Sequence, residues 1–86
     1  MSQLSQIKSQ ISAIAAKTEQ TAAALNAYAQ ELQNSIAIVN SSIGGTSSND
    51  DKDMVSALQA GQKSVKDAAM QLANAATKAK EWVSKA

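Results

Sequence analysis

The sequence predicts an all-α fold: an antiparallel two-helix hairpin, which dimerisation or a helical partner completes to a four-helix bundle. Two segments with apolar residues at helical spacing support this prediction, one from about residue 2 to 43 and one from about residue 49 to 85. A glycine pair and several helix-capping residues separate them, around residues 44–48. The 86 residues include no proline, so neither segment contains the residue that most often breaks a helix. We expect one domain, residues 1–86.

In the first segment, apolar residues follow one another in steps of three and four, with one wider step. This stripe consists of Leu4, Ile7, Ile11, Ile14, Leu25, Ala29, Leu32, Ile36, Val39 and Ile43. The wider step, from Ile14 to Leu25, has the length of a hendecad, which locally relaxes a left-handed supercoil. Thr18, Thr21 and Ala22 fill it, and we expect this part of the helix contact to be the weakest.

The turn is predicted at Ile43, Gly44 and Gly45. Glycine readily takes the positive φ that the residue just past a helix end often needs, so the pair suits the end of the first helix. Asp50 and Asp51 place negative charge at the N-terminus of the second helix, where the helix dipole favours it.

The second segment carries an unbroken stripe of its own. The stripe is Met54, Leu58, Gly61, Val65, Ala68, Leu72, Ala75, Ala79, Trp82 and Ala86, with Val55, Ala69, Ala76 and Val83 beside it. Gly61 lies in the helix interior, where glycine is about 1 kcal/mol less favourable than alanine. We therefore expect the two helices to approach closely at Gly61, and we expect Trp82 to pack in the core.

Folding the chain at the glycines aligns positions whose residue numbers add up to about 94. Ala22 then faces Leu72, and Leu32 faces Gly61, so large residues face small ones as interdigitated packing requires. The residues predicted to pack between the helices are Leu25, Leu32, Gly61, Val65, Leu72 and Trp82.

Composition argues against catalysis and metal binding. The chain has no cysteine and no histidine, which excludes disulfides, thiolate nucleophiles, imidazole bases and zinc fingers. The acidic run at residues 49–53 lacks the glycine and the closing glutamate of a calcium loop, so we interpret it as a helix cap. We expect no enzyme activity, no cofactor and no metal.

Charge and hydropathy limit the partners and the location. Eight lysines against seven acidic residues, without any arginine, disfavour nucleic-acid binding. The first ten residues are polar, unlike a signal peptide, and no stretch has the roughly 20 apolar residues of a membrane span. We expect synthesis in the cytoplasm and no membrane insertion, with export without a cleaved signal peptide left open.

One apolar stripe per helix is a small core for a chain of this size. Tyr28, Ile38 and Met70 are large apolar residues that lie off both stripes. We predict that they bind a helical partner, either another hairpin or a second copy of this chain, which completes a four-helix bundle.

The architecture resembles the WXG family of type VII secretion proteins, which are small hairpins with a glycine turn near the midpoint. Ile43-Gly44-Gly45 occupies the place of the family's Trp-x-Gly turn, with Ile where the family has Trp. Residues 82–86, Trp-Val-Ser-Lys-Ala, differ at both ends from the family's Tyr-x-x-x-Asp/Glu secretion signal. The resemblance implies a co-secreted protein, or an adaptor that binds a helical protein such as the N-terminal domain of a secreted toxin and targets it to the secretion system.

Two other classes stay open. A type III secretion needle subunit is a self-assembling hairpin of similar length, although such proteins typically have a proline-containing turn. A homodimeric coiled-coil module would have no role in secretion. Filaments would indicate the needle subunit, a discrete homodimer the coiled-coil module, and a labile monomer an adaptor without its partner.

Overall fold

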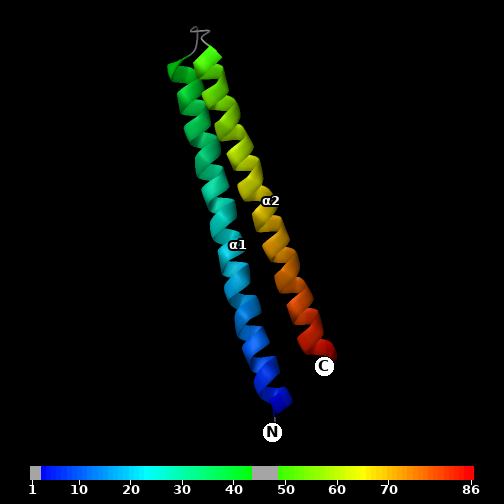
Figure 1. Cartoon of the computed structure of the whole chain (residues 1–86). Helices are drawn as coiled ribbons and strands as arrows, with labels where there is room; N and C mark the ends of the chain where they lie inside the picture. The colour runs from blue at the N-terminus through cyan, green and yellow to red at the C-terminus, as the bar shows by residue number, and fades with distance from the viewer. Residues whose placement is uncertain (1–2, 44–48) are drawn as a thin grey trace.

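The computed structural model of the chain consists of two long antiparallel helices (Figure 1). It describes residues 3–43 and 49–86. Helix α1 spans Gln3–Ser42 and helix α2 spans Asn49–Lys85. The predicted hairpin is confirmed, and these helix bounds agree with the expected ones to within about a residue. Ile43 continues the hydrogen bonding of α1, since its amide donates to the carbonyl of Val39 at 3.0 Å, whereas Gly44 and Gly45 lie outside the described residues.

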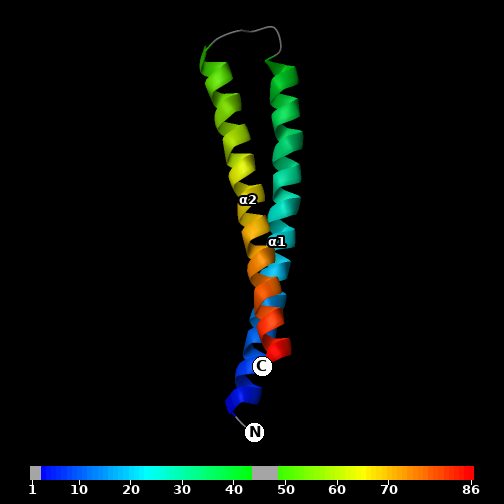
Figure 2. The same ribbon diagram turned by 90° about the vertical axis from the view of Figure 1, so that its right-hand side faces the viewer.

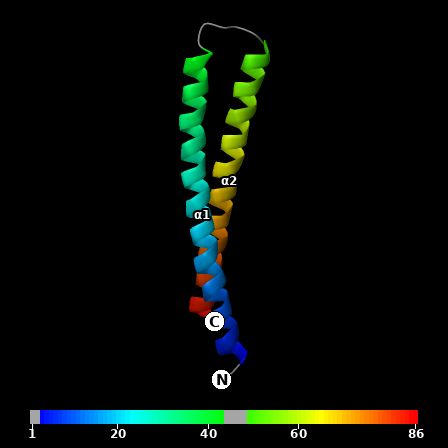
Figure 3. The same ribbon diagram turned by 90° about the vertical axis from the view of Figure 1, so that its left-hand side faces the viewer.

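The hairpin is a narrow rod with principal-axis extents of 67 × 16 × 14 Å. Seen from the two sides, the two helices cross each other in the half that holds the termini (Figures 2 and 3). The first turns of α1 extend past the end of α2 in all three views. Neither helix in the described part of the chain is long and apolar enough to cross a membrane.

Almost all the residues that the helix contact covers fall on one unbroken heptad pattern, with steps of three and four along each helix. We call these residues the seam. They are Ile11, Ala15, Thr18, Ala22, Leu25, Ala29, Leu32, Ile36, Val39 and Ile43 on α1, and Asp51, Val55, Leu58, Gln62, Val65, Ala69, Leu72, Ala76, Ala79 and Val83 on α2. Of the six seam residues that are fully buried, five are alanines. Small side chains at these positions let the two backbones approach closely.

The register agrees with the one expected from the sequence. Paired by residue numbers that add up to 94, the seam residues of the two helices match one to one, as Ala22 does with Leu72. Gln62 supports this register from within the seam. Its Nε2 donates to the backbone carbonyl of Ala29 at 3.1 Å and to Oε1 of Gln33 at 3.4 Å. These bonds tie the middle of α2 to the middle of α1.

The expected hendecad between Ile14 and Leu25 is wrong. Ala15, Thr18 and Ala22 continue the seam without a gap, whereas Ile14 lies beside it and is 60% exposed. Ile14 is the more hydrophobic of the two neighbours, but the close approach of the helices at this point selects the smaller Ala15. The contact is nevertheless built of small residues here, because Ala15, Thr18 and Ala22 provide it.

The expected close approach at Gly61 is also wrong. Gly61 is exposed, and a Cβ added there would meet no atom within 4 Å. Trp82 is 43% exposed and lies beside the seam, so the prediction that it packs in the core is wrong as well. Gln62 and Val83, the next residues along α2, take the seam positions instead. The other four residues predicted to pack between the helices, Leu25, Leu32, Val65 and Leu72, are half-buried seam residues.

Candidate binding surface

Eight large apolar side chains of the described chain are substantially exposed. They are Leu4, Ile7, Ile14, Tyr28, Ile38, Met54, Met70 and Trp82. Single exposed apolar residues are ordinary on protein surfaces, but an aligned set marks a candidate interaction site. The question is therefore which of these residues share a face.

Five of them fall into two rows along one side of the hairpin. Each row consists of the residues that come one position before a seam residue and recur every seven residues, so each row keeps to one side of its helix. We call the two rows the apolar flank. They are Ile7, Ile14, Thr21 and Tyr28 on α1, and Met54, Gly61, Ala68, Ala75 and Trp82 on α2. Because the helices are antiparallel, rows that precede the seam on both helices lie on the same side of the contact.

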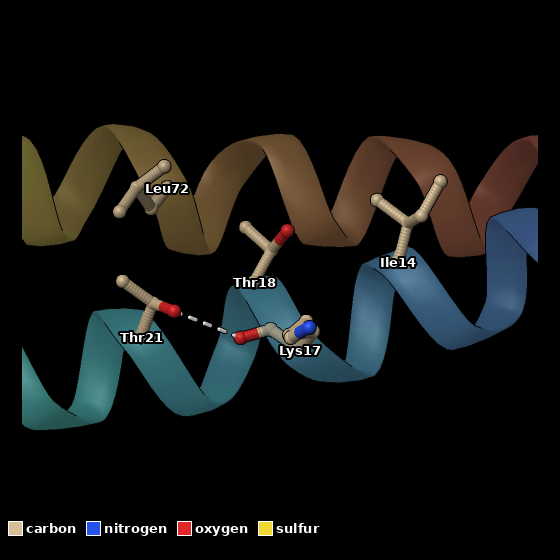
Figure 4. A pocket seen from close by; sticks show the side chains of 5 residues that line it. All are labelled: Ile14, Lys17, Thr18, Thr21 and Leu72. Carbon is tan, nitrogen blue, oxygen red and sulfur yellow. Dashed lines mark hydrogen bonds between the residues drawn. The ribbon is translucent and has the colours of Figure 1, made fainter.

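A shallow hollow of about 240 Å³ lies on this flank. Figure 4 shows Ile14, Thr18 and Thr21 projecting from α1 toward α2, with Leu72 opposite them. The hydroxyl of Thr21 donates to the carbonyl of Lys17 at 3.1 Å. With its hydroxyl bonded to its own helix, Thr21 offers mainly its methyl group to the hollow. The hollow therefore presents apolar atoms although two of its residues are threonines.

The opposite side of the hairpin is polar. Its two rows come one position after a seam residue, and we call them the polar flank. They are Ser12, Glu19, Asn26, Gln33 and Asn40 on α1, and Lys52, Gln59, Lys66, Ala73 and Lys80 on α2. The Nζ of Lys80 donates to Oε2 of Glu19 across the helices, which places these rows on one side of the contact. The surface is thus apolar on one flank and charged on the other.

The structure does not bring the three predicted partner-binding residues onto one face. Tyr28 belongs to the apolar flank and is 51% exposed. Ile38 comes one position before the seam residue Val39, so it lies on the outer side of α1 beside the apolar flank, where it lines a separate hollow with Ala37, Ser41 and Ser42. Met70 follows the seam residue Ala69 and therefore lies on the side of the polar flank. The predicted surface is wrong in this respect, because lying off the stripe does not say on which side of it a residue lies.

Sequence reasoning missed Ile7, Ile14 and Met54 as surface residues because it had assigned them to the helix contact. Their signal was present in the sequence as spacing: Ile7, Ile14 and Tyr28 are separated by multiples of seven, and so are Met54 and Trp82. Such a row marks a side of a helix, but only the burial of its neighbours shows which side faces the partner helix.

Among residues 3–43 and 49–86, no group of three or more acidic, cysteine or histidine residues is placed to hold a metal ion. Comparisons with protein-family models, with curated proteins and with solved structures find no match to this chain. The functional argument therefore depends on the apolar flank and on the chemistry of its residues.

Proposed function

We propose that this protein is a non-catalytic helical adaptor that binds another helical protein through the apolar flank. The observation that carries the proposal is the alignment of five exposed large apolar residues along one side of a hairpin whose other side is polar. The bound helices complete a four-helix bundle with α1 and α2, which removes the flank from water.

The flank has enough apolar surface to drive such binding. Its five large residues are between 43% and 60% exposed. Burying a large apolar side chain completely contributes about 1.5–3 kcal/mol, so covering their exposed parts contributes roughly 4–7 kcal/mol in total. The loss of side-chain and rigid-body freedom on binding reduces this favourable free energy, and the apolar surface that the partner buries adds to it. Gly61, Ala68 and Ala75 in the row on α2 have small side chains, which would let a partner helix approach α2 closely.

The resemblance to the WXG family supports a more specific role. In this role the protein is a bacterial adaptor of a type VII secretion system, and its partner is the helical N-terminal domain of a secreted toxin. An adaptor of this kind needs a surface that recognises helices and no catalytic group. A flank with large exposed apolar residues on both helices meets that need.

The test is binding to a helical toxin domain encoded beside this protein, measured by calorimetry with purified components. We expect the double variant Ile14→Glu, Tyr28→Glu to lose binding by at least a hundredfold, because it places two charges in the apolar contact. The matched control, Met70→Glu with Ala73→Glu, adds the same charges to exposed apolar residues on the side of the polar flank and should bind within a few fold of wild type. Circular dichroism checks that both variants keep the helices.

Equal loss in the flank variant and its control would show that the flank is not the binding surface. The secretion role has a separate readout, which is the amount of toxin in the medium of cells that carry each variant. If the flank variant abolishes binding in vitro but toxin export is unchanged, the protein is a binding module with no targeting role.

A further inference from the structure

We propose that Met54 is the site at which oxidation controls the apolar flank: a peroxide converts its thioether to the sulfoxide, and the oxidised chain binds its helical partner more weakly. The inference rests on the proposed function, since it concerns the same flank and the same partner. It is carried by the position of Met54 in the flank, by the exposure of its side chain and by the reactivity of its sulfur atom.

Among the described residues, Met54 is the one large apolar side chain that the two flank rows place in the half of the hairpin next to the turn. On α1, the last large residue of the row is Tyr28, and the row continues from there with serines. On α2, the row continues from Met54 to Gly61, which has no side chain. Ile38 lies near the same level, but beside the flank on the outer side of α1.

The distance along the rod shows how much of the flank depends on Met54. In the register of the hairpin, in which facing residue numbers add up to 94, Met54 lies level with Asn40 of α1. At about 1.5 Å per residue, that level is roughly 18 Å from Tyr28 along the helix. A partner helix that covers the flank on this side of Tyr28 therefore has to contact Met54.

The side chain of Met54 is open to small oxidants in the free hairpin. It is 44% exposed and comes one position before the seam residue Val55. The sequence has no cysteine, so the thioethers of methionine are the side chains that a peroxide attacks first. Met70 is 68% exposed and lies on the side of the polar flank. A peroxide therefore reaches both of these sulfur atoms, but only that of Met54 belongs to the binding surface.

The reaction consumes one molecule of peroxide for each methionine. A lone pair of Sδ attacks one peroxide oxygen, and the S–O bond forms as the O–O bond breaks. The second oxygen takes up the proton of the first and leaves as water, so the sulfur is oxidised by two electrons and the peroxide is reduced. The product is a polar sulfoxide, which methionine sulfoxide reductases convert back to the thioether. The modification is therefore reversible.

The sulfoxide weakens partner binding because its oxygen is a hydrogen-bond acceptor that loses its water when the flank is covered. The thioether of Met54 can be buried against a partner helix without this loss. The next residues of the row on α2, Gly61 and Ala68, have no side-chain donor that could replace the water. We expect the Kd for the partner to rise roughly tenfold on oxidation of Met54.

Partner binding and oxidation of Met54 oppose each other in both directions. A partner that covers the flank keeps peroxide away from Met54, so bound chains stay reduced at this residue. Free chains are oxidised and lose affinity. Met70 lies on the other side of the hairpin and is open to peroxide in both states. Oxidation at Met54 thus distinguishes chains without a partner from chains with one, as thermodynamic linkage between the two events requires.

The test treats the purified protein with dilute hydrogen peroxide and measures its binding to the helical toxin domain by calorimetry. The Kd of the wild type should rise roughly tenfold, and treatment with methionine sulfoxide reductases for both epimers should restore it. Met54→Leu keeps a large apolar side chain without sulfur, so peroxide should change its Kd by less than about twofold. Met70→Leu is the matched control and should lose affinity as the wild type does. Met1 is present in every variant, so its oxidation does not distinguish them.

The rate of sulfoxide formation, measured by mass spectrometry of peptides, is a second readout. In the complex with the toxin domain, Met54 should be oxidised roughly tenfold more slowly than in the free hairpin, whereas the rate at Met70 should change by less than about twofold. Circular dichroism should show that the oxidised chain keeps its helices, because Met54 lies outside the seam.

An unchanged Kd in wild-type protein that is oxidised at Met54 would overturn this inference and leave the adaptor function standing. An equal loss of affinity in peroxide-treated Met54→Leu would place the damage at another residue and would also overturn it. Loss of the helices on oxidation would show that Met54 supports the hairpin and not the flank. An untreated wild type that binds no helical toxin domain would refute the adaptor function itself, and this inference with it.

Discussion

Replacing Gly61 by alanine should stabilise the isolated hairpin. Gly61 lies in the interior of α2, and the methyl group of alanine would meet no atom within 4 Å. The substitution therefore keeps every contact and removes the conformational freedom that glycine has in the unfolded chain. The expected gain in the free energy of unfolding is about 1 kcal/mol. For a domain of this length, that gain corresponds to a rise in Tm of about 4–8 °C.

The assay is thermal unfolding followed by circular dichroism, at a protein concentration low enough that further dilution does not change Tm. Gly61→Leu should also be at least as stable as the wild type under these conditions, because leucine is a good helix former and the site is open. A lower Tm for Gly61→Ala in the dilute hairpin would show that the helices meet at Gly61 after all, which would refute the position of the seam.

Three further substitutions test the seam and the polar flank by urea unfolding. Leu72→Ala should lower the free energy of unfolding by about 2 kcal/mol, because the alanine opposite it cannot fill the space; a loss below 0.5 kcal/mol would argue against the register. Gln62→Ala should cost about 1 kcal/mol by removing its hydrogen bond to a carbonyl of α1, and an unchanged stability would show that this bond does not form in solution. Glu19→Gln should cost less than about 1 kcal/mol, because the Lys80 pair is exposed, and the difference should shrink in 1 M salt; a loss that salt does not reduce would mean that Glu19 acts through packing.

The hairpin and its register were predictable because they depend on features that the sequence displays directly. Two helical periodicities separated by a glycine pair define the elements, and the match of large with small residues across the turn defines the alignment. Ala22 facing Leu72 is one case in which the prediction and the structure agree. Both features can be found in the sequence without knowing which side chains the helix contact buries.

The seam itself was misplaced by one residue in parts of both helices, for a physical reason. Ile14 and Trp82 are more hydrophobic than Ala15 and Val83, and a hydrophobicity criterion chooses them for the core. The two helices pack so closely that alanines occupy most of the fully buried positions, and larger side chains are displaced to the side. At Ile14 and Ala15, and at Trp82 and Val83, the smaller of the two neighbours therefore lies in the seam and the larger lies beside it.

The binding surface could be predicted only in part. Tyr28 is large and lies off the stripe, but the same criterion also selects Met70, which lies on the side of the polar flank, and Ile38, which lies on the outer side of α1 beside the apolar flank. A surface needs the direction of each side chain around its helix, and that direction is known only once the seam is placed to the residue. With the seam at Ala15, Ala22 and Ala29, the flank follows from the seven-residue spacing alone.

The emission of Trp82 tests the central claim most directly, because it is the single tryptophan of the chain and belongs to the apolar flank. Its side chain is 43% exposed in the free hairpin, and a helical protein that covers the flank removes it from water. We predict that its emission maximum shifts to shorter wavelength as a helical toxin domain is added, and that Ile14→Glu with Tyr28→Glu abolishes the shift. An emission maximum that is the same with a bound toxin domain as without it would contradict the claim that this flank is the binding surface.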